Sequence, residues 1–234
     1  MSPPRLAGVA AEGQNARRMR AVLFDLDGTL INTGALYAEA YRRAFAAELE
    51  TVPTWEEMLR RSPASERLFL LDWFGPELGD RVHQRMCESY EALAEELLGG
   101  FFEGVPEMLE ELRGRGVTMG VVTGKSRRAF AATCRSLPLE RYFDVVVLED
   151  DVPAPKPDPQ GLVRALEALE AEPHEAVYVG DTPMDVEAAH RAGMIGASAL
   201  WCRRPEDRER LAQKLEPRVW ALHAPRELCA RLPR

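Results

Sequence analysis

The stretch Ala21-Val-Leu-Phe24-Asp25-Leu-Asp27-Gly28-Thr29-Leu30 decides how the rest of the chain is interpreted. Its first four residues form an apolar run with β character, and two carboxylates and a glycine follow at once. This order is typical of a buried strand that ends in a functional loop. Paired carboxylates such as Asp25 and Asp27 suit a hard cation, and they can also divide the roles of nucleophile and general acid/base. The alternative is that Asp27-Gly28 is a plain turn.

The composition places the chain among ordinary globular proteins. Of its 234 residues, 46% are hydrophobic and 29% are charged, which excludes a wholly disordered chain and leaves room for one or two domains. The net charge of −8 argues against nucleic acid or an anionic membrane as a partner. We expect a cytoplasmic protein, because no stretch approaches the ~20 apolar residues of a membrane span and the start lacks the apolar core of a secretory signal. The cysteines form no CxxC pair and are expected to be reduced thiols, with no disulfide frame or zinc site: Cys87, Cys134, Cys202 and Cys229.

Beyond the opening stretch, the apolar pattern first becomes helical and then alternates. Residues 35–100 carry apolar residues at helical spacing, interrupted by prolines and without a strand signal. After residue 100 short apolar strands alternate with helices, which predicts a parallel sheet covered on both faces. We expect strands at 117–122, 145–148, 176–179 and 195–200, and helices at 105–115, 126–136, 159–170 and 183–192, followed by a terminal strand and helix.

These patterns predict an α/β protein with a doubly wound, Rossmann-like parallel sheet and an inserted all-helical cap. The core would comprise residues 20–32 and 101–234, and the cap residues 33–100. Residues 1–19 are rich in Pro, Gly and Arg and are expected to form a loose N-terminal extension, with Met19 as a candidate for the natural start.

Three further strand ends carry residues of interest, and ligands bind at the carboxyl ends of strands in parallel α/β sheets. Thr123 and Gly124 offer a hydroxyl and free amides for a phosphate, although this segment taken alone favours simple N-capping by Ser126. Lys156 lies between two prolines in a chain with only three lysines, and it is suited to neutralise carboxylates and a phosphate. Asp158 is expected to cap the next helix.

The last of these ends contains two aspartates. Asp185 is accounted for as the third residue of a helix that Thr182 caps and Pro183 begins. Asp181 precedes that cap and is the better candidate for a metal ligand.

The four segments together resemble the four motifs of the haloacid dehalogenase superfamily, in its phosphatase branch. They are DLDGTL at 25–30, VVTGKS at 121–126, PKPDP at 155–159 and VGDTPMD at 179–185. The helical insertion resembles the cap of the phosphoglycolate-phosphatase and β-phosphoglucomutase group, and the resemblance covers residues 20–203.

The resemblance implies a mechanism and a cofactor. Asp25 would attack phosphorus to form an aspartyl-phosphate, and Asp27 would protonate the leaving oxygen and then activate water. Thr123 and the Gly124 amide would bind phosphoryl oxygens, with Lys156 balancing charge. Mg²⁺ would be held by the Asp25 carboxylate, the Asp27 carbonyl oxygen and Asp181, with Asp185 orienting this set or binding through water.

The substrate implied is a small phosphorylated metabolite, phosphoglycolate among the candidates, acted on by a monomer or homodimer. Pyrophosphatase or sugar-phosphate mutase activity and a catalytically silent binding module are the alternatives. Asp27 disfavours a dehalogenase, whose leaving halide needs no proton, and a cap without lysine disfavours the mutase. The cap cations considered for a second anionic group of the substrate are Arg60, Arg61 and Arg67.

Overall fold

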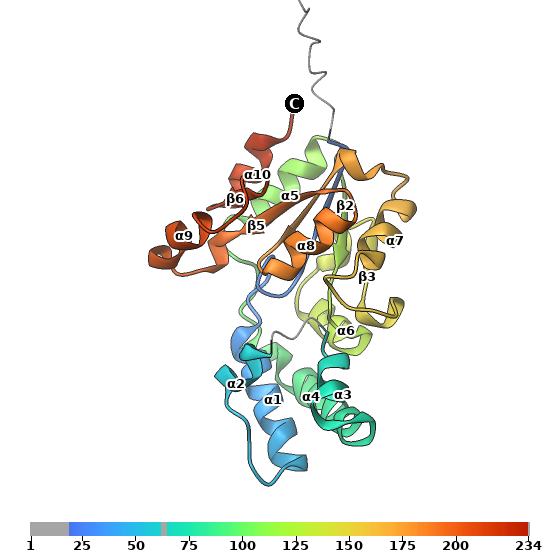
Figure 1. Ribbon diagram of the computed structural model, residues 1–234, viewed down its shortest axis with the longest axis vertical. Coiled ribbons are helices and arrows are strands. Elements are labelled where there is room, and N and C mark those ends of the chain that lie inside the picture. The colour runs from blue at the N-terminus through green and yellow to red at the C-terminus, as the bar shows by residue number, and fades with distance from the viewer. Residues whose placement is uncertain (1–18, 62–64, 234) are drawn as a thin grey trace, which may run out of the picture.

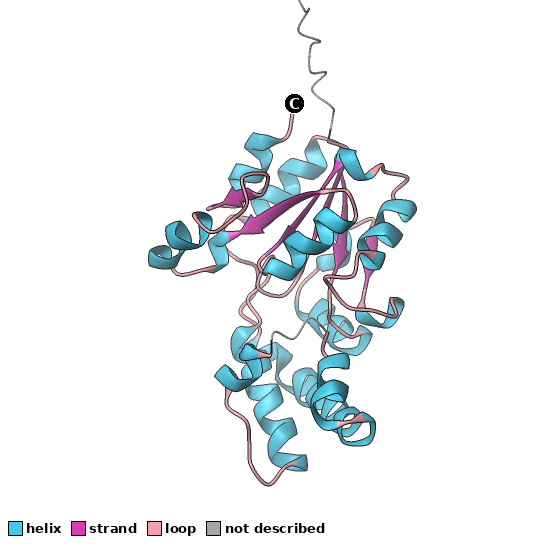
Figure 2. Cartoon of the chain, in the orientation of Figure 1, coloured by secondary structure: helices cyan, strands magenta, loops and turns pink. Residues whose placement is uncertain are grey.

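The computed structural model describes residues 19–61 and 65–233, so the expected N-terminal extension lies outside the described residues except for Met19. A sheet with helices on both sides forms one part of the molecule, and a helical lobe lies below it (Figure 1). Within the described residues strands are confined to the upper part, and the lobe consists of helices and loops (Figure 2).

The sheet has six parallel strands in the order β3-β2-β1-β4-β5-β6, which confirms the doubly wound parallel sheet. The chain order reverses between β1 and β4, so the residues that follow these two strands meet at the switch point. The predicted strands agree with the observed ones to within one residue at each end. Their bounds are β1 Ala21–Phe24, β2 Thr118–Val122, β3 Val145–Val147, β4 Ala176–Gly180, β5 Ile195–Ala199 and β6 Trp220–Leu222.

Alternating side chains on each strand attach helices to both faces of the sheet. In β1, Val22 and Phe24 join the apolar cluster under α5 and α10, and Ala21 and Leu23 join the cluster under α7 and α8. The helices of this part are α5 Val105–Gly114, α6 Arg127–Ser136, α7 Gln160–Ala168, α8 Pro183–Arg191, α9 Pro205–Ala212 and α10 Arg226–Arg231. Short 3-10 turns are η1 Leu139–Arg141, η2 Glu149–Asp151, η3 Pro173–Glu175 and η4 Leu200–Cys202.

The helical lobe has an apolar core of its own, with Tyr90 and Phe45 among its buried side chains. Its helices are α1 Gly34–Glu48, α2 Trp55–Arg60, α3 Leu68–Phe74 and α4 Pro76–Leu97. Helix α6 contacts both parts, because Ala129 and Ala132 pack into the apolar core of the lobe while Phe130 packs into the cluster under the sheet.

The chain enters and leaves the lobe side by side. Ile31 and Phe101 form an antiparallel bridge, and Asn32 N–H donates to the Gly100 carbonyl at 2.8 Å. The boundaries of 33 and 100 for a separate cap domain stay a prediction.

The four cysteines are free thiols, and none of the described helices combines the length and apolar character needed to cross a membrane.

Candidate active site

A cavity of about 330 Å³ opens between the carboxyl ends of the strands and the helical lobe. Every residue predicted for the site lines it: Asp25, Asp27, Thr123, Gly124, Lys156, Asp181 and Asp185. These residues come from the segments that follow four different strands, with Asp185 in the first turn of α8, so the parallel topology brings them together.

The loop after β1 is shaped by close contact with Asp181. The Asp25 N–H donates to the Val179 carbonyl at 2.9 Å, which fixes the first carboxylate beside β4. Gly28 has a φ of +80°, and a Cβ built there would lie 2.9 Å from Asp181 Oδ2. The turn therefore requires glycine both for its backbone and for its nearness to a carboxylate. Thr29 Oγ1 lies 3.5 Å from both Asp25 Oδ2 and Asp181 Oδ1.

Lys156 lies between the carboxylates of two different loops. Its Nζ donates to Asp25 Oδ1 at 2.7 Å, to Asp185 Oδ1 at 2.6 Å and to the Tyr178 hydroxyl at 3.0 Å. Burial alone would lower the pKa of Lys156, but the charges of Asp185 and Asp25 raise it well above its usual value. Lys156 therefore stays charged and offsets one of the buried carboxylates.

Burial and the nearness of other carboxylates raise the pKa values of two aspartates in the site. Burial, together with the charges of Asp185 and Asp181, raises the pKa of Asp25 to about 8, although Lys156 opposes the shift. Burial and the charge of Asp185 raise the pKa of Asp181 to about 6, although Arg203 donates to it at 2.8 Å. The oxygens of Asp25 and Asp181, which both lie 3.5 Å from the Thr29 hydroxyl, are a set of ligands suited to a hard divalent cation. The residues present therefore fit Mg²⁺.

Asp185 has both the structural role and the contacts of a site residue. Its Oδ2 accepts from Thr182 N–H at 2.9 Å and from Thr182 Oγ1 at 2.6 Å, which confirms the predicted cap at the start of α8. Its Oδ1 accepts from Lys156, and Asp185 is 1% exposed. Burial alone would raise the pKa of Asp185, but Lys156 and the hydrogen bonds from Thr182 hold it below its usual value.

Of the two other predicted helix caps, one is present. Ser126 Oγ accepts from Ala129 N–H at 3.3 Å and caps α6. The prediction of Asp158 as N-cap is wrong by one residue, because α7 begins at Gln160 and Pro159 occupies the N-cap position. Asp158 Oδ1 still accepts from Gln160 N–H at 2.9 Å.

Lys125 is a site residue that the sequence analysis missed. Its side chain is fully buried, and its Nζ donates to both oxygens of Asp27, at 3.0 and 3.2 Å, and to the Tyr37 hydroxyl at 2.6 Å. Tyr37 in turn hydrogen-bonds Glu66, which comes from the helical lobe and accepts from Ser126 N–H at 3.0 Å. The scarcity of lysine that drew attention to Lys156 was an equally good signal for Lys125.

The arginines considered for the substrate do not line this cavity. The Arg61 guanidinium lies 4.0 Å from the centre of the Trp73 ring, and Arg67 forms an ion pair with Asp80 at 2.7 Å. Arg60 is exposed at the end of α2. Arg61 and Arg67 are thus engaged on the lobe surface, and a contact of these arginines with the substrate stays untested. Helix α2 instead contributes Trp55, Met58 and Leu59 to the cavity wall.

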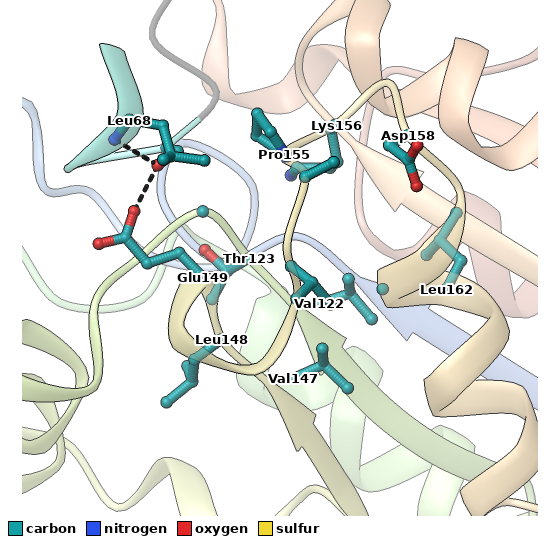
Figure 3. A pocket seen from close by; sticks show the side chains of 15 residues that line it. Leu68, Val122, Thr123, Val147, Leu148, Glu149, Pro155, Lys156, Asp158 and Leu162 are labelled. Atoms are coloured by element: carbon teal, nitrogen blue, oxygen red, sulfur yellow. Dashed lines mark hydrogen bonds between the residues drawn. The ribbon is translucent and has the colours of Figure 1, made fainter. Parts of the chain in front are cut away.

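Thr123 and Lys156 also line a small adjoining pocket (Figure 3). In that view the dashed lines run from Glu149, which accepts from Ser65 Oγ at 2.5 Å, to Leu68, whose N–H donates to the same Ser65 Oγ at 3.0 Å. The sheet loops and the lobe are thus in polar contact next to the site.

Comparison with known proteins places the chain in a family. Residues 22–198 match the model of the haloacid dehalogenase-like hydrolases. Pyrophosphatase PpaX of Bacillus cereus strain G9842 is 33% identical over 198 residues, which cover 79% of this chain and 84% of the relative. The structure of a putative β-phosphoglucomutase from Thermotoga maritima is similar with a TM-score of 0.60 and 32% identity, over 77% of this chain and 85% of that one. A putative phosphoglycolate phosphatase from Lactobacillus plantarum shares the fold, with a TM-score of 0.76 and 22% identity over 91% and 99% of the two chains.

Proposed function

This chain belongs to the haloacid dehalogenase-like hydrolases, and from that premise we propose that it hydrolyses a phosphate monoester of a small metabolite through an aspartyl-phosphate on Asp25, with Mg²⁺ as cofactor. One observation carries the proposal. A buried carboxylate at the end of β1, a lysine 2.7 Å away and a second carboxylate two residues on line one cavity with Thr123 and Asp181.

Asp25 is the group to which we assign nucleophilic attack. The attacking group must be ionised, yet burial and its neighbours raise the pKa of Asp25 to about 8. Lys156 favours the ionised form and lies where it can also balance the charge of a phosphoryl group bound to Thr123 and the Gly124 amide. Most of the rate enhancement would come from this positioning and charge balance.

The cation would be held by the carboxylates of Asp25 and Asp181 and by the backbone carbonyl of Asp27. When bound, it would offset the repulsion between an anionic nucleophile and a phosphate dianion. The oxygens of Asp185 already accept from Lys156 and Thr182, so its contribution would be to position Lys156 and the loop that carries Asp181.

Asp27 is the group to which we assign proton transfer. An alkoxide leaving group needs a proton, and the water that hydrolyses the intermediate must lose one. Asp27 lines the cavity with its carboxylate fixed by Lys125, which also donates to the Tyr37 hydroxyl. Since Tyr37 lies on α1, closure of the lobe would help to set the position of this acid/base.

The cavity wall favours a substrate whose organic group carries no charge of its own. Its cations among the described residues are Lys125, Lys156 and Arg203, and each is already paired with a carboxylate. The wall from α2 is apolar at Met58 and Leu59. We therefore place a phosphate monoester whose organic group is uncharged ahead of substrates with a second anionic group, including phosphoglycolate.

Pyrophosphate is the second candidate, because PpaX relatives that are 33% identical to this chain are named pyrophosphatases. A sugar-phosphate mutase is a weaker alternative, since the segment 33–100 contains no lysine. A silent binding module is disfavoured by the complete set of acidic and basic residues in the cavity. A cytoplasmic location and a monomeric or homodimeric state are part of the proposal.

Phosphate release from a panel of phosphorylated compounds tests the proposal. The panel contains phosphoglycolate, hexose phosphates, nucleotides and pyrophosphate, each assayed with Mg²⁺ and with excess chelator. We expect turnover that the chelator abolishes and that Asp25→Asn removes, while Asp72→Asn at an exposed position of the lobe leaves it unchanged. Turnover that survives both the chelator and Asp25→Asn would contradict the mechanism, and release only from pyrophosphate would select the second candidate.

A further inference from the structure

A second cluster of potential metal ligands lies where the lobe meets the sheet loops, and the proposed reaction does not use it. His83 and Cys87 are four residues apart on α4 and therefore lie on one face of that helix. Glu66 joins them from the segment before α3. The three ligand atoms all lie within 4.8 Å of one another, and Glu66 and Cys87 are buried.

The two separations measured from His83 to the other ligands of this cluster are close to those of a tetrahedral metal site. His83 Nε2 lies 3.5 Å from Cys87 Sγ and 3.8 Å from Glu66 Oε2. Zinc bonds of about 2.0 Å to N and O and about 2.3 Å to S, at tetrahedral angles, separate such ligand pairs by roughly 3.3–3.6 Å. Glu149 Oε1 lies 3.5 Å from the same His83 nitrogen and offers a fourth donor. Binding of a cation therefore needs shifts of only a few tenths of an ångström in the separations of His83 Nε2 from Cys87 Sγ and from Glu66 Oε2.

The surrounding hydrogen bonds hold the carboxylates in place. Glu149 Oε2 accepts from Ser65 Oγ at 2.5 Å (Figure 3). It also accepts from Arg67 N–H at 3.1 Å. Glu66 Oε2 accepts from Ser126 N–H at 3.0 Å. Outer hydrogen bonds of this kind orient the ligands of metal sites and add to their affinity.

From this geometry we propose that Glu66, His83 and Cys87, with Glu149 beside them, bind a divalent cation of the Zn²⁺ class. One imidazole, one thiolate and carboxylate oxygens form a donor set that suits Zn²⁺ or Co²⁺ and does not suit Mg²⁺. Without the cation, the imidazole is paired with the two carboxylates. The cation replaces the proton of a charged His83 and the thiol proton of Cys87, so the net charge of the buried cluster is unchanged.

A cation bound at this cluster would link the lobe to the loop after β3. Glu66, His83 and Cys87 belong to the lobe segment, whereas Glu149 follows β3. The spacing of the cysteines in the sequence did not predict this site, because its ligands come from three separate segments and only His83 and Cys87 are near in sequence.

Cobalt(II) provides a test that separates this site from the carboxylates of the active site. A thiolate bound to Co²⁺ gives a near-ultraviolet charge-transfer band, and carboxylate ligands do not. The full-length protein is treated with chelator, freed of it, saturated with Mg²⁺ and titrated with Co²⁺ under reducing, oxygen-free conditions. We expect the thiolate band to saturate at about one equivalent of Co²⁺, as for one site, and to disappear when Zn²⁺ is added.

Matched variants assign the band. Cys87→Ser and His83→Gln should abolish it, whereas Cys134→Ser and Cys202→Ser should retain it, and circular dichroism checks that each variant is folded. No thiolate band in the unmodified protein would overturn the proposal without reference to any variant. A band that survives Cys87→Ser, or that is lost in Cys202→Ser, would also overturn it. Since no readout depends on turnover, failure here is distinct from failure of the proposed function.

Discussion

Replacing the nucleophile with its amide should stabilise the metal-free protein while it abolishes turnover. Asp25 is 6% exposed and crowded by Asp181 and Asp185, and the pKa of Asp25 is raised from 3.8 to about 8. Asp25→Asn keeps the shape of the side chain and an oxygen that accepts from Lys156. The amide carries no charge, so it does not have to take up a proton when it is buried. The substitution therefore restores the free energy of folding that the wild type loses by burying one carboxylate too many.

The size of this gain follows from proton linkage. Between about pH 4 and pH 8 the folded protein holds a proton on Asp25 that the unfolded chain has lost, so wild-type stability falls as pH rises through this window. At about 1.4 kcal/mol for each pH unit above the ordinary pKa, the cost is roughly 4 kcal/mol near pH 7. Water entry and relaxation screen buried charges, so about 4 kcal/mol is an upper bound.

Urea unfolding in excess chelator measures this difference for Asp25→Asn, with Asp72→Asn as the exposed control. We expect the advantage of Asp25→Asn to grow with pH from about pH 5 to pH 7, with a slope of up to about 1.4 kcal/mol per pH unit. The control should stay within about 0.5 kcal/mol of the wild type. An Asp25→Asn protein that is no more stable than the wild type, or whose advantage does not depend on pH, would refute the electrostatic reasoning.

Two further substitutions test other parts of the site. Gly28→Ala should lower Mg²⁺ affinity and cost about 3 kcal/mol of folding stability, because the Gly28 backbone is left-handed and the added Cβ would press on Asp181. Gly75 has a similar φ, and an added Cβ there would have no atom within 4 Å, so Gly75→Ala should lose stability through backbone strain alone. Equal Mg²⁺ affinity in both variants would count against this account. Burial alone would lower the pKa of His83, but hydrogen bonds to the Cys87 thiol and to two glutamates raise it to about 11. The folding stability that charged His83 supplies is therefore complete below about pH 6.5 and is lost as the pH rises toward 11. In chelator, His83→Gln should therefore lose about 1–3 kcal/mol near pH 6 and less near pH 9, and a loss independent of pH would argue that His83 is uncharged.

The sheet and its loops were predictable because their signals are local. Apolar runs such as Ala21–Phe24 end directly in polar loop residues, and a parallel sheet places those ends at one edge whatever the details of packing. Thr182 and Ser126 cap helices from within their own segments, so their roles were also visible in the sequence.

Contacts between the lobe and the sheet loops were not predictable in this way. Lys125 pairs with Asp27 and Tyr37 because α1 folds over the loop after β2, and no spacing in the sequence encodes that approach. The cap arginines show the converse, since their charges suggested a substrate contact and the fold directs Arg67 to Asp80. Where a long side chain points depends on the tertiary packing of its helix, which the apolar pattern leaves open.

The most direct test of the central claim is detection of a phosphoryl group on Asp25. Asp27→Asn is incubated with Mg²⁺ and an activated aryl phosphate, whose leaving group needs no acid, and the reaction is quenched in acid for peptide mass spectrometry. The account predicts that the peptide containing Asp25 gains the mass of one phosphoryl group, and that this gain is absent with chelator and in the double variant with Asp25→Asn. Turnover of the aryl phosphate with no phosphorylated Asp25, or with the phosphoryl group on another residue, would contradict it.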